Sequence, residues 1–198
     1  LTAVADEPGN ALAWARLAEL WLALGDIGEA GTAAARAEQI APDLERVQTV
    51  RGFVALAGIR TREAQAAFER AVALDSASPL PRFGLGLARI RSGELEAGRG
   101  DIEVAVGLDP GRSLLRSYLG KAYFEERRDP LVGRQYDIAK EMDPADPTPW
   151  FYGALLKQSE NRPVEALAEL ENSIRRNDNR AVYRSRALLD SDRAARQA

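Results

Sequence analysis

The side chains that most often carry catalysis and metal binding are missing from this sequence. Its 198 residues include no histidine and no cysteine. This composition excludes a serine–histidine nucleophile, a catalytic thiolate, a disulfide and a zinc–thiolate centre. The groups that remain for chemistry are carboxylates, basic side chains, hydroxyls and glycine-rich segments.

Two short patterns of these groups could signal a site, and neither fits one. Gly84-Leu85-Gly86 lies inside an expected helix rather than after a strand, so it does not match a dinucleotide-binding turn. Asp190-Ser191-Asp192 supplies too few oxygen ligands for a calcium loop. The sequence also contains no phosphate-binding loop and no nucleophile elbow. We therefore expect no catalytic, cofactor-binding or metal-binding residues, and we expect that the chain is not an enzyme.

Charge gives no indication of a nucleic-acid or membrane partner. The chain has 27 basic and 30 acidic residues and a net charge of −3. The basic cluster near the C-terminus has one interleaved aromatic residue, Tyr183, and does not indicate nucleic-acid binding; its arginines are Arg175, Arg176, Arg180, Arg184 and Arg186. The most apolar stretch, residues 11–25, contains Arg16 and Glu19 and is too short to cross a bilayer. We expect no membrane insertion of this segment.

A period of 34 residues organises the chain. Similar segments end at Pro42, Pro110 and Pro144, which are 68 and 34 residues apart. Aligned at this period, the chain divides into five full units: 11–44, 45–78, 79–112, 113–146 and 147–180. Residues 1–10 match the tail of a preceding unit, and residues 181–198 match the first helix of a sixth. These boundaries predict a single solenoid domain that is a fragment of a longer protein.

Small and large side chains recur at fixed positions of the unit. The eighth position is occupied by Ala18, Gly52, Gly86, Gly120 and Ala154, and the twenty-fourth by Ala34, Phe68, Ile102, Tyr136 and Leu170. Each unit contains two amphipathic stretches of about 14 residues separated by a short turn, which indicates a helical hairpin. Small residues allow two helices to approach closely, and large ones fill the remaining space. The pattern predicts an all-α array of antiparallel helix pairs.

This pattern resembles the tetratricopeptide repeat family over essentially the whole chain. The resemblance rests in the first unit on Trp14, Leu17, Ala18, Trp21, Ala30, Ala37 and Pro42, and in the fourth on Leu119, Gly120, Tyr123, Tyr136, Ala139 and Pro144. It implies a right-handed superhelical solenoid whose concave face is lined by the first helix of each unit. It also implies a non-catalytic function, because members of that family mostly bind other proteins.

In that family the concave groove is formed by fixed positions of the first helix. Carried onto this sequence, those positions give the candidate partner-binding residues Phe53, Leu56, Leu80, Phe83, Leu87, Ile90, Lys121, Phe124 and Phe151. The apolar stripe from Phe53 to Ile90 would suit an amphipathic helix or an extended peptide. A second interpretation stays open, in which the same side chains pack between neighbouring first helices and belong to the core.

Two functional classes follow from this pattern. The first is a scaffold that binds a peptide or helix of a partner protein of unknown identity in the groove. The second is a structural or assembly element that self-associates, as a homo-oligomer, or spaces flanking domains. Residues 1–44 have an excess of acidic side chains and residues 181–198 an excess of basic ones, an asymmetry that would favour head-to-tail contact between chains.

Composition also bears on the source. The abundance of alanine and arginine indicates a bacterial origin. Residues 178–190 are faintly similar to bacterial repeat proteins of the cell envelope, which favours the periplasm or cell envelope over the cytoplasm.

Charged residues and glycines depart from the repeat pattern at several places. Arg51, Arg89 and Lys157 occupy columns that are otherwise apolar. Their stems could cover apolar surface while their heads reach water, or they could form buried ion pairs. In the third unit, Gly84 and Gly100 lack an evident packing role, as does Gly107, and this predicts that the third unit is the softest part of the array.

Overall fold

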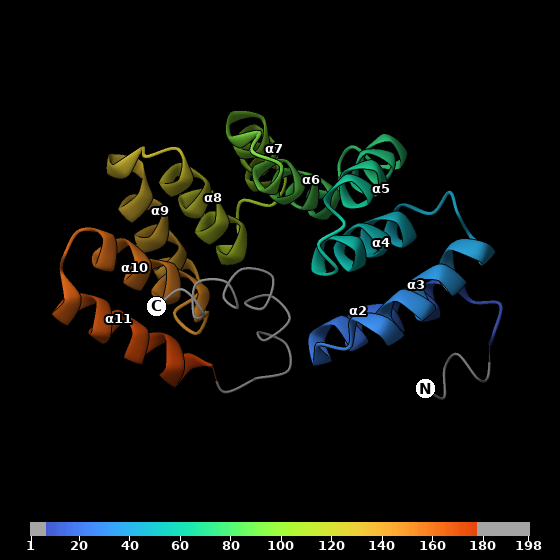
Figure 1. The fold of residues 1–198 in the computed structure, drawn as a ribbon, viewed down its shortest axis with the longest axis horizontal. Helices are drawn as coiled ribbons and strands as arrows, with labels where there is room; N and C mark the ends of the chain where they lie inside the picture. Colours follow the sequence, from blue (N-terminus) through green and yellow to red (C-terminus); the bar gives the residue numbers. More distant parts are fainter. Residues whose placement is uncertain (1–6, 178–198) are drawn as a thin grey trace.

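The structure is a computed structural model that describes residues 7–177. Within this range the chain forms ten α-helices and no strand (Figure 1). The helices are α2 (Ala11–Leu24), α3 (Ile27–Ile40), α4 (Glu45–Ala57), α5 (Thr61–Leu74), α6 (Pro79–Arg91), α7 (Leu95–Leu108), α8 (Ser113–Glu125), α9 (Asp129–Met142), α10 (Thr148–Ser159) and α11 (Pro163–Arg176). The sixth-unit helix expected over 181–198 lies outside the described residues.

The helices form five hairpins, each made of a first helix and a second helix. The first helices begin at residues 11, 45, 79, 113 and 148, so successive starts are 34, 34, 34 and 35 residues apart. Each second helix packs on its own first helix and, where a further pair follows, also on the first helix of that pair. The result is the predicted all-α solenoid of antiparallel helix pairs.

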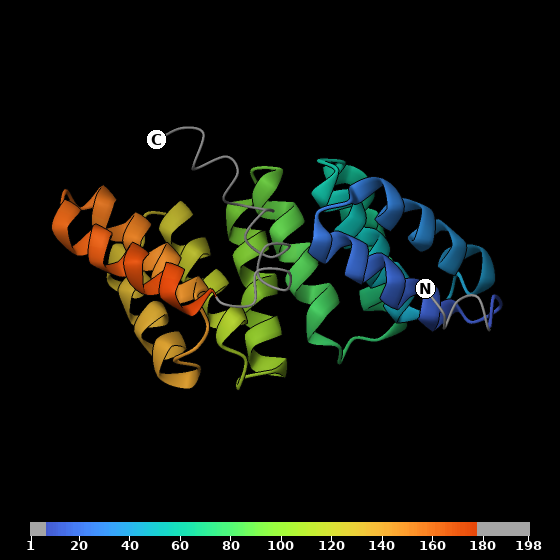
Figure 2. The same ribbon diagram turned by 90° about the horizontal axis from the view of Figure 1, so that it is seen from below.

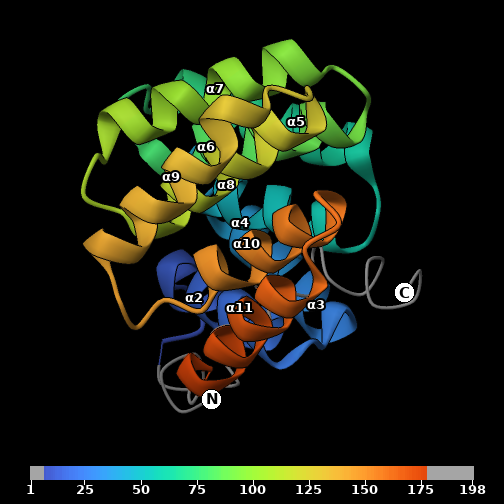
Figure 3. The ribbon, with the colours of Figure 1, turned by 90° about the vertical axis from the view of Figure 1, so that its left-hand side faces the viewer.

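Three of the four neighbouring pairs of first helices touch one another, which goes with the curvature of the solenoid. Helix α2 contacts α4, α4 contacts α6, and α8 contacts α10, whereas no two second helices among the described residues make comparable contacts. Figure 1 shows the resulting arc, with α4, α6 and α8 on its inner side and α5, α7 and α9 outside. Figure 2 shows that the array is elongated, and Figure 3 shows that successive pairs are rotated, so the array is superhelical.

The turn inside each hairpin uses one residue with left-handed backbone conformation. These residues fall in the same column of the repeat, with φ between 57° and 90°: Gly25, Ile59, Gly93, Arg127 and Asn161. At the start of the array, the side chain of Asn10 accepts a hydrogen bond from the N–H of Ala13 and caps α2. Local signals of this kind fix where each helix begins and ends.

Close helix contacts explain a glycine that the sequence pattern leaves without a role. A Cβ atom on Gly84 of α6 would lie 2.2 Å from the ring of Phe68, and one on Gly52 of α4 would lie 2.5 Å from the same ring. The expectation that Gly84 lacks a packing role is therefore wrong, because the ring lies between two first helices. Nothing lies within 4 Å of a Cβ on Gly100 or Gly107, so the expected softness of the third unit stays a prediction that now rests on those two residues.

The charged residues in apolar columns form ion pairs. In α6, Arg89 reaches the buried carboxylate of Asp101 in α7 at 2.6 Å, and Arg82 reaches the same carboxylate at 3.2 Å. Arg51 pairs with Glu38 of the preceding second helix. The buried ion pair describes Arg89, whose partner Asp101 is buried. Arg51 and Lys157 pair with Glu38 and Glu160, which are partly exposed, so their charged heads reach water.

Two alanine substitutions test the role assigned to these glycines. Gly84→Ala should lower the free energy of unfolding by about 1–3 kcal/mol, because the new methyl group overpacks the Phe68 ring. Gly100→Ala places a methyl group in open space inside a helix and should raise that free energy by about 0.5–1 kcal/mol. Urea denaturation followed by circular dichroism measures both. Equal effects of the two substitutions would contradict the assignment.

Candidate partner-binding groove

The inner side of the arc presents apolar side chains from four first helices. Most of them are half-buried because one side packs on the main hydrophobic core while the other remains accessible. The residues packed in this way are Phe53, Leu87, Ile90, Phe124, Phe151 and Leu155. We call this set the inner apolar row. It extends from α4 to α10, so it crosses four consecutive repeats.

A ladder of aromatic rings, which includes Phe53 of this row, joins the repeats. The ring centroids of Phe53 and Phe68 are 4.9 Å apart, and those of Phe53 and Phe83 are 6.4 Å apart. Phe83 meets the edge of Tyr118 at 4.9 Å, and Tyr118 meets Tyr152 at 5.5 Å. Edge-to-face contacts of this kind add to the stability gained by burial. The ladder therefore holds the first helices at fixed relative positions.

The nine residues predicted to contact a partner fall into two groups that differ in burial. Leu56 and Phe83 are buried, so they belong to the core and are not available to a ligand. The remaining seven are half-buried and lie on first helices: Phe53, Leu80, Leu87, Ile90, Lys121, Phe124 and Phe151. Binding at these seven positions stays a prediction.

Tyr118 and Tyr152 are structural parts of this face that the family resemblance does not indicate. They fall between the positions that line the groove in that family. A signal was available, because the two tyrosines are 34 residues apart and therefore share a column of the repeat. A recurring aromatic side chain in one column indicates a contact that is repeated along the array.

Charged groups on the first helices are paired with one another. Glu19 of α2 meets Arg46 of α4 at 2.5 Å, and Lys121 lies 3.3 Å from Glu125 within α8. Arg91 of α6 donates a hydrogen bond to the backbone carbonyl of Leu56 at 2.6 Å. These contacts lower the tendency of the face to attract charged ligands, and they leave the inner apolar row as its main distinguishing feature.

A polar cluster fixes the C-terminal end of α8, where part of the inner apolar row lies. Arg99 of α7 lies 2.8 Å from Glu126 and 2.7 Å from Glu103, and the Tyr123 hydroxyl donates to Glu103 at 2.9 Å. Burial raises the pKa of Tyr123 above its ordinary value, and the hydrogen bond to Glu103 raises it further. The hydroxyl therefore remains a protonated donor at neutral pH.

Comparison with known proteins shows the fold. No family model matches the sequence, and no curated protein is a significant match. Among solved structures, the thermophilic TPR protein TTC0263 of Thermus thermophilus has a TM-score of 0.80 and 19% identity, over 91% of this chain and 99% of that one. The chain has the tetratricopeptide repeat (TPR) fold.

Two further structural neighbours indicate where such arrays occur. YrrB, described as a TPR protein with an unusual peptide-binding site, has a TM-score of 0.57 and 16% identity, over 93% of this chain and 96% of that one. A mutant O-GlcNAc transferase of Thermobaculum terrenum has a TM-score of 0.55 and 27% identity, over 57% of this chain and 22% of that one. Helices arranged in this way therefore also form part of an enzyme.

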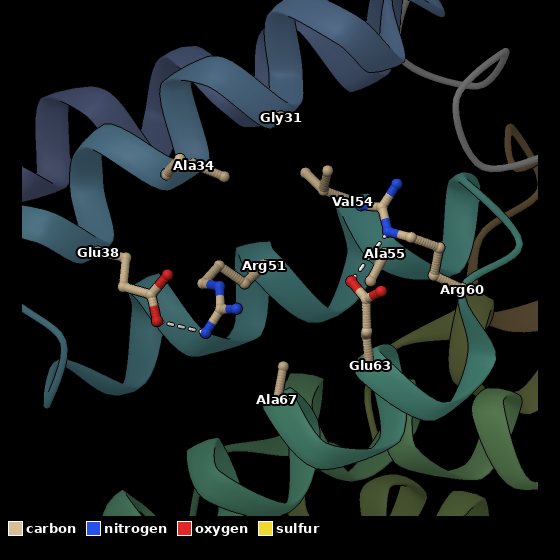
Figure 4. Close-up of a pocket in the computed structure, with 10 residues that line it drawn as sticks. Gly31, Ala34, Glu38, Arg51, Val54, Ala55, Arg60, Glu63 and Ala67 are labelled. Atoms are coloured by element: carbon tan, nitrogen blue, oxygen red, sulfur yellow. Dashed lines mark hydrogen bonds and ion pairs between the residues drawn. The ribbon is translucent and has the colours of Figure 1, made fainter.

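A shallow pocket of the TPR array lies away from the inner apolar row, between α3, α4 and α5, with a volume of about 180 Å³. Figure 4 shows that Arg51 faces Glu38 across it and that Arg60 faces Glu63. Because these charged groups pair with one another, the pocket offers no set of free groups aimed at a ligand.

Residues 7–177 contain neither a candidate metal site nor a candidate membrane-spanning helix. In that range no group of three or more acidic side chains is placed to hold a metal ion. None of the ten helices has the length and apolar character that crossing a bilayer requires.

Truncation of two phenylalanines distinguishes core from groove. Phe83→Ala should lower the free energy of unfolding by about 3–5 kcal/mol, because it opens a cavity and removes the central ring of the ladder. Phe151→Ala should lower it clearly less, since part of that side chain remains in contact with solvent. Denaturant titration of both variants gives the comparison. An equal or larger loss for Phe151→Ala would contradict the assignment of Phe83 to the core.

Proposed function

We propose that this chain is a non-catalytic interaction scaffold that binds a helix or an extended peptide of another protein on its concave face. The observation that carries the proposal is the inner apolar row. Its side chains are held by the core on one side and remain partly accessible on the other, across four first helices in succession. Apolar surface that is aligned and partly exposed in this way is typical of a partner surface.

The spacing of the row favours a helical or extended ligand. Packed helices lie about 8–10 Å apart, so anchors from neighbouring repeats are separated by a similar distance. Residues i and i+7 of a ligand helix are about 10.5 Å apart, and residues i and i+3 of an extended polyproline II segment, which lie on one face, are about 9.3 Å apart. Either ligand could place successive apolar side chains on successive first helices.

The chemistry of the face defines the class of partner further. Ion pairs such as Glu19–Arg46 and Lys121–Glu125 already satisfy charged groups on the first helices. Affinity therefore comes mainly from apolar anchors, and the proposed partner is a protein segment with regularly spaced large apolar residues. The peptide-binding site named for YrrB supports a peptide ligand by likeness of fold. The bacterial origin, the envelope location and the repeat boundaries at 11–44 and onward remain predictions.

Selection from a random peptide library tests the proposal. Peptides enriched on the chain are synthesised, and their affinity is measured by fluorescence anisotropy. The groove variant Leu87→Glu/Phe151→Glu should bind them at least about tenfold more weakly, because each carboxylate would have to be desolvated against an apolar anchor. Circular dichroism of this variant should remain helical.

The matched control changes apolar residues on second helices. Leu74 in α5 and Val104 in α7 are both exposed. Leu74→Glu/Val104→Glu introduces the same two charges and should leave peptide affinity unchanged. Unchanged peptide affinity of the folded groove variant would contradict the groove proposal, and so would an equal loss of affinity in the control.

A further inference from the structure

The shallow pocket between α3, α4 and α5 is a space inside the array that the chain leaves unfilled. It lies between the second helices α3 and α5, over α4, and its volume is about 180 Å³ (Figure 4). The small or apolar residues that line it are Gly31, Ala34, Ala35, Val54, Ala55 and Ala67. A cavity of about 150 Å³ is large enough to hold benzene. The pocket therefore has room for one aromatic ring.

Three lining alanines stand in columns of the repeat that carry large polar side chains further along the chain. They are Ala35, Ala55 and Ala67. Further along, their columns hold Glu69, Glu103 and Asp137 for the first, Arg89, Tyr123 and Lys157 for the second, and Asp101, Gln135 and Glu169 for the third. The three columns therefore change together, from small and apolar at this pocket to large and polar in the later repeats.

In the later repeats these polar side chains fill the space between consecutive second helices. Arg89 of α6 lies 2.6 Å from Asp101 of α7 and 3.6 Å from Glu69 of α5, so it joins both second helices. Lys140 of α9 meets Glu169 of α11 at 2.7 Å. The three alanines of the pocket leave the equivalent space between α3 and α5 open.

On α8 the equivalent position holds an aromatic ring with a hydrogen-bonding tip. The hydroxyl of Tyr123 donates to Glu103 of α7 at 2.9 Å, and the guanidinium of Arg99 lies 5.9 Å from the centre of the ring. Tyr123 shares its column with Ala55, and Glu103 shares its column with Ala35. The chain itself therefore shows which kind of side chain this place in a repeat accepts.

Charge balance in the pocket favours a neutral occupant. Glu38 pairs with Arg51, and Arg60 lies 2.9 Å from Glu63, so the lining residues have no net charge. A charged guest would lose its hydration without gaining an unpaired opposite charge. A phenol ring is neutral, can contact a guanidinium through its face, and has a hydroxyl that can donate to a carboxylate.

We propose that this pocket binds a tyrosine side chain of a partner protein. The ring would lie on Ala34, Ala55 and Ala67, and the hydroxyl would donate to a carboxylate of the rim, Glu38 or Glu63. The proposal does not depend on the function assigned to the groove, because the pocket and the inner apolar row share no residue.

Titration of the full chain with N-acetyl-L-tyrosinamide, followed by NMR, tests the proposal. The methyl signals of Ala35, Ala55 and Ala67 should shift saturably, with a dissociation constant on the order of 1 mM for a ligand of this size. The absence of saturable shifts up to about 20 mM would overturn the proposal, including the case in which residues outside 7–177 already close the pocket.

A second probe tests the choice of tyrosine. N-acetyl-L-phenylalaninamide lacks the hydroxyl donor and should bind about threefold or more weakly, because it leaves the rim carboxylate without that hydrogen bond. Equal or tighter binding of the phenylalanine probe would overturn the assignment to tyrosine.

Two blocking variants and a control place the probe in the pocket. Ala35→Glu/Ala55→Tyr grafts the Glu103–Tyr123 pair into this position and should abolish probe binding, because its own ring fills the space. Ala35→Leu starts from an exposed residue of the rim and should weaken binding without entering the core. The control Ala66→Tyr changes an exposed alanine of α5 outside the pocket and should bind the probe like the wild type.

Circular dichroism establishes which of these variants are folded. Unchanged probe affinity in a folded blocking variant would overturn the proposal. An equal loss of affinity in the folded control would overturn it as well, because the probe would then not distinguish the pocket from the rest of α5.

Discussion

A second helix in this array buries its apolar side only when the first helix of the next pair lies against it. The contact between Phe68 and the glycines Gly52 and Gly84 shows how tight that requirement is, since even a methyl group at either glycine would meet the ring. In a solenoid each repeat contacts only its neighbours, so this junction carries the stability from one pair to the next.

The junction also determines which surface is offered to a partner. It holds α4, α6, α8 and α10 close enough for their aromatic rings to form a ladder, from Phe53 through Phe83 and Tyr118 to Tyr152. Side chains on the inner side of that ladder are half-buried and supported from below. A ligand would meet a preformed surface, and a preformed surface limits the entropy lost on binding.

The sequence allows the fold to be predicted because the junction repeats in it. Columns of small and large residues recur every 34 positions, and the helices follow that spacing. The predicted stripe was less reliable in detail. Leu56 is buried although Leu22, Ile90 and Phe124 in its column are half-buried, because depth depends on neighbouring side chains. Phe83 follows its column, in which Ala15, Thr49 and Ser117 are buried and only Phe151 is half-buried. Gly84 was misjudged because its partner, Phe68, lies in the preceding repeat and in a different column. Contacts between columns require three-dimensional structure.

Hydrogen exchange on Phe68→Ala tests most directly whether the junctions between neighbours stabilise the array. The substitution empties the contact between α5 and the helices α4 and α6. Exchange measured by mass spectrometry should show faster opening of α4 to α7, while α10 and α11 keep the protection that they have in the wild type. Loss of protection confined to α5, or an equal loss across all ten helices, would contradict the account.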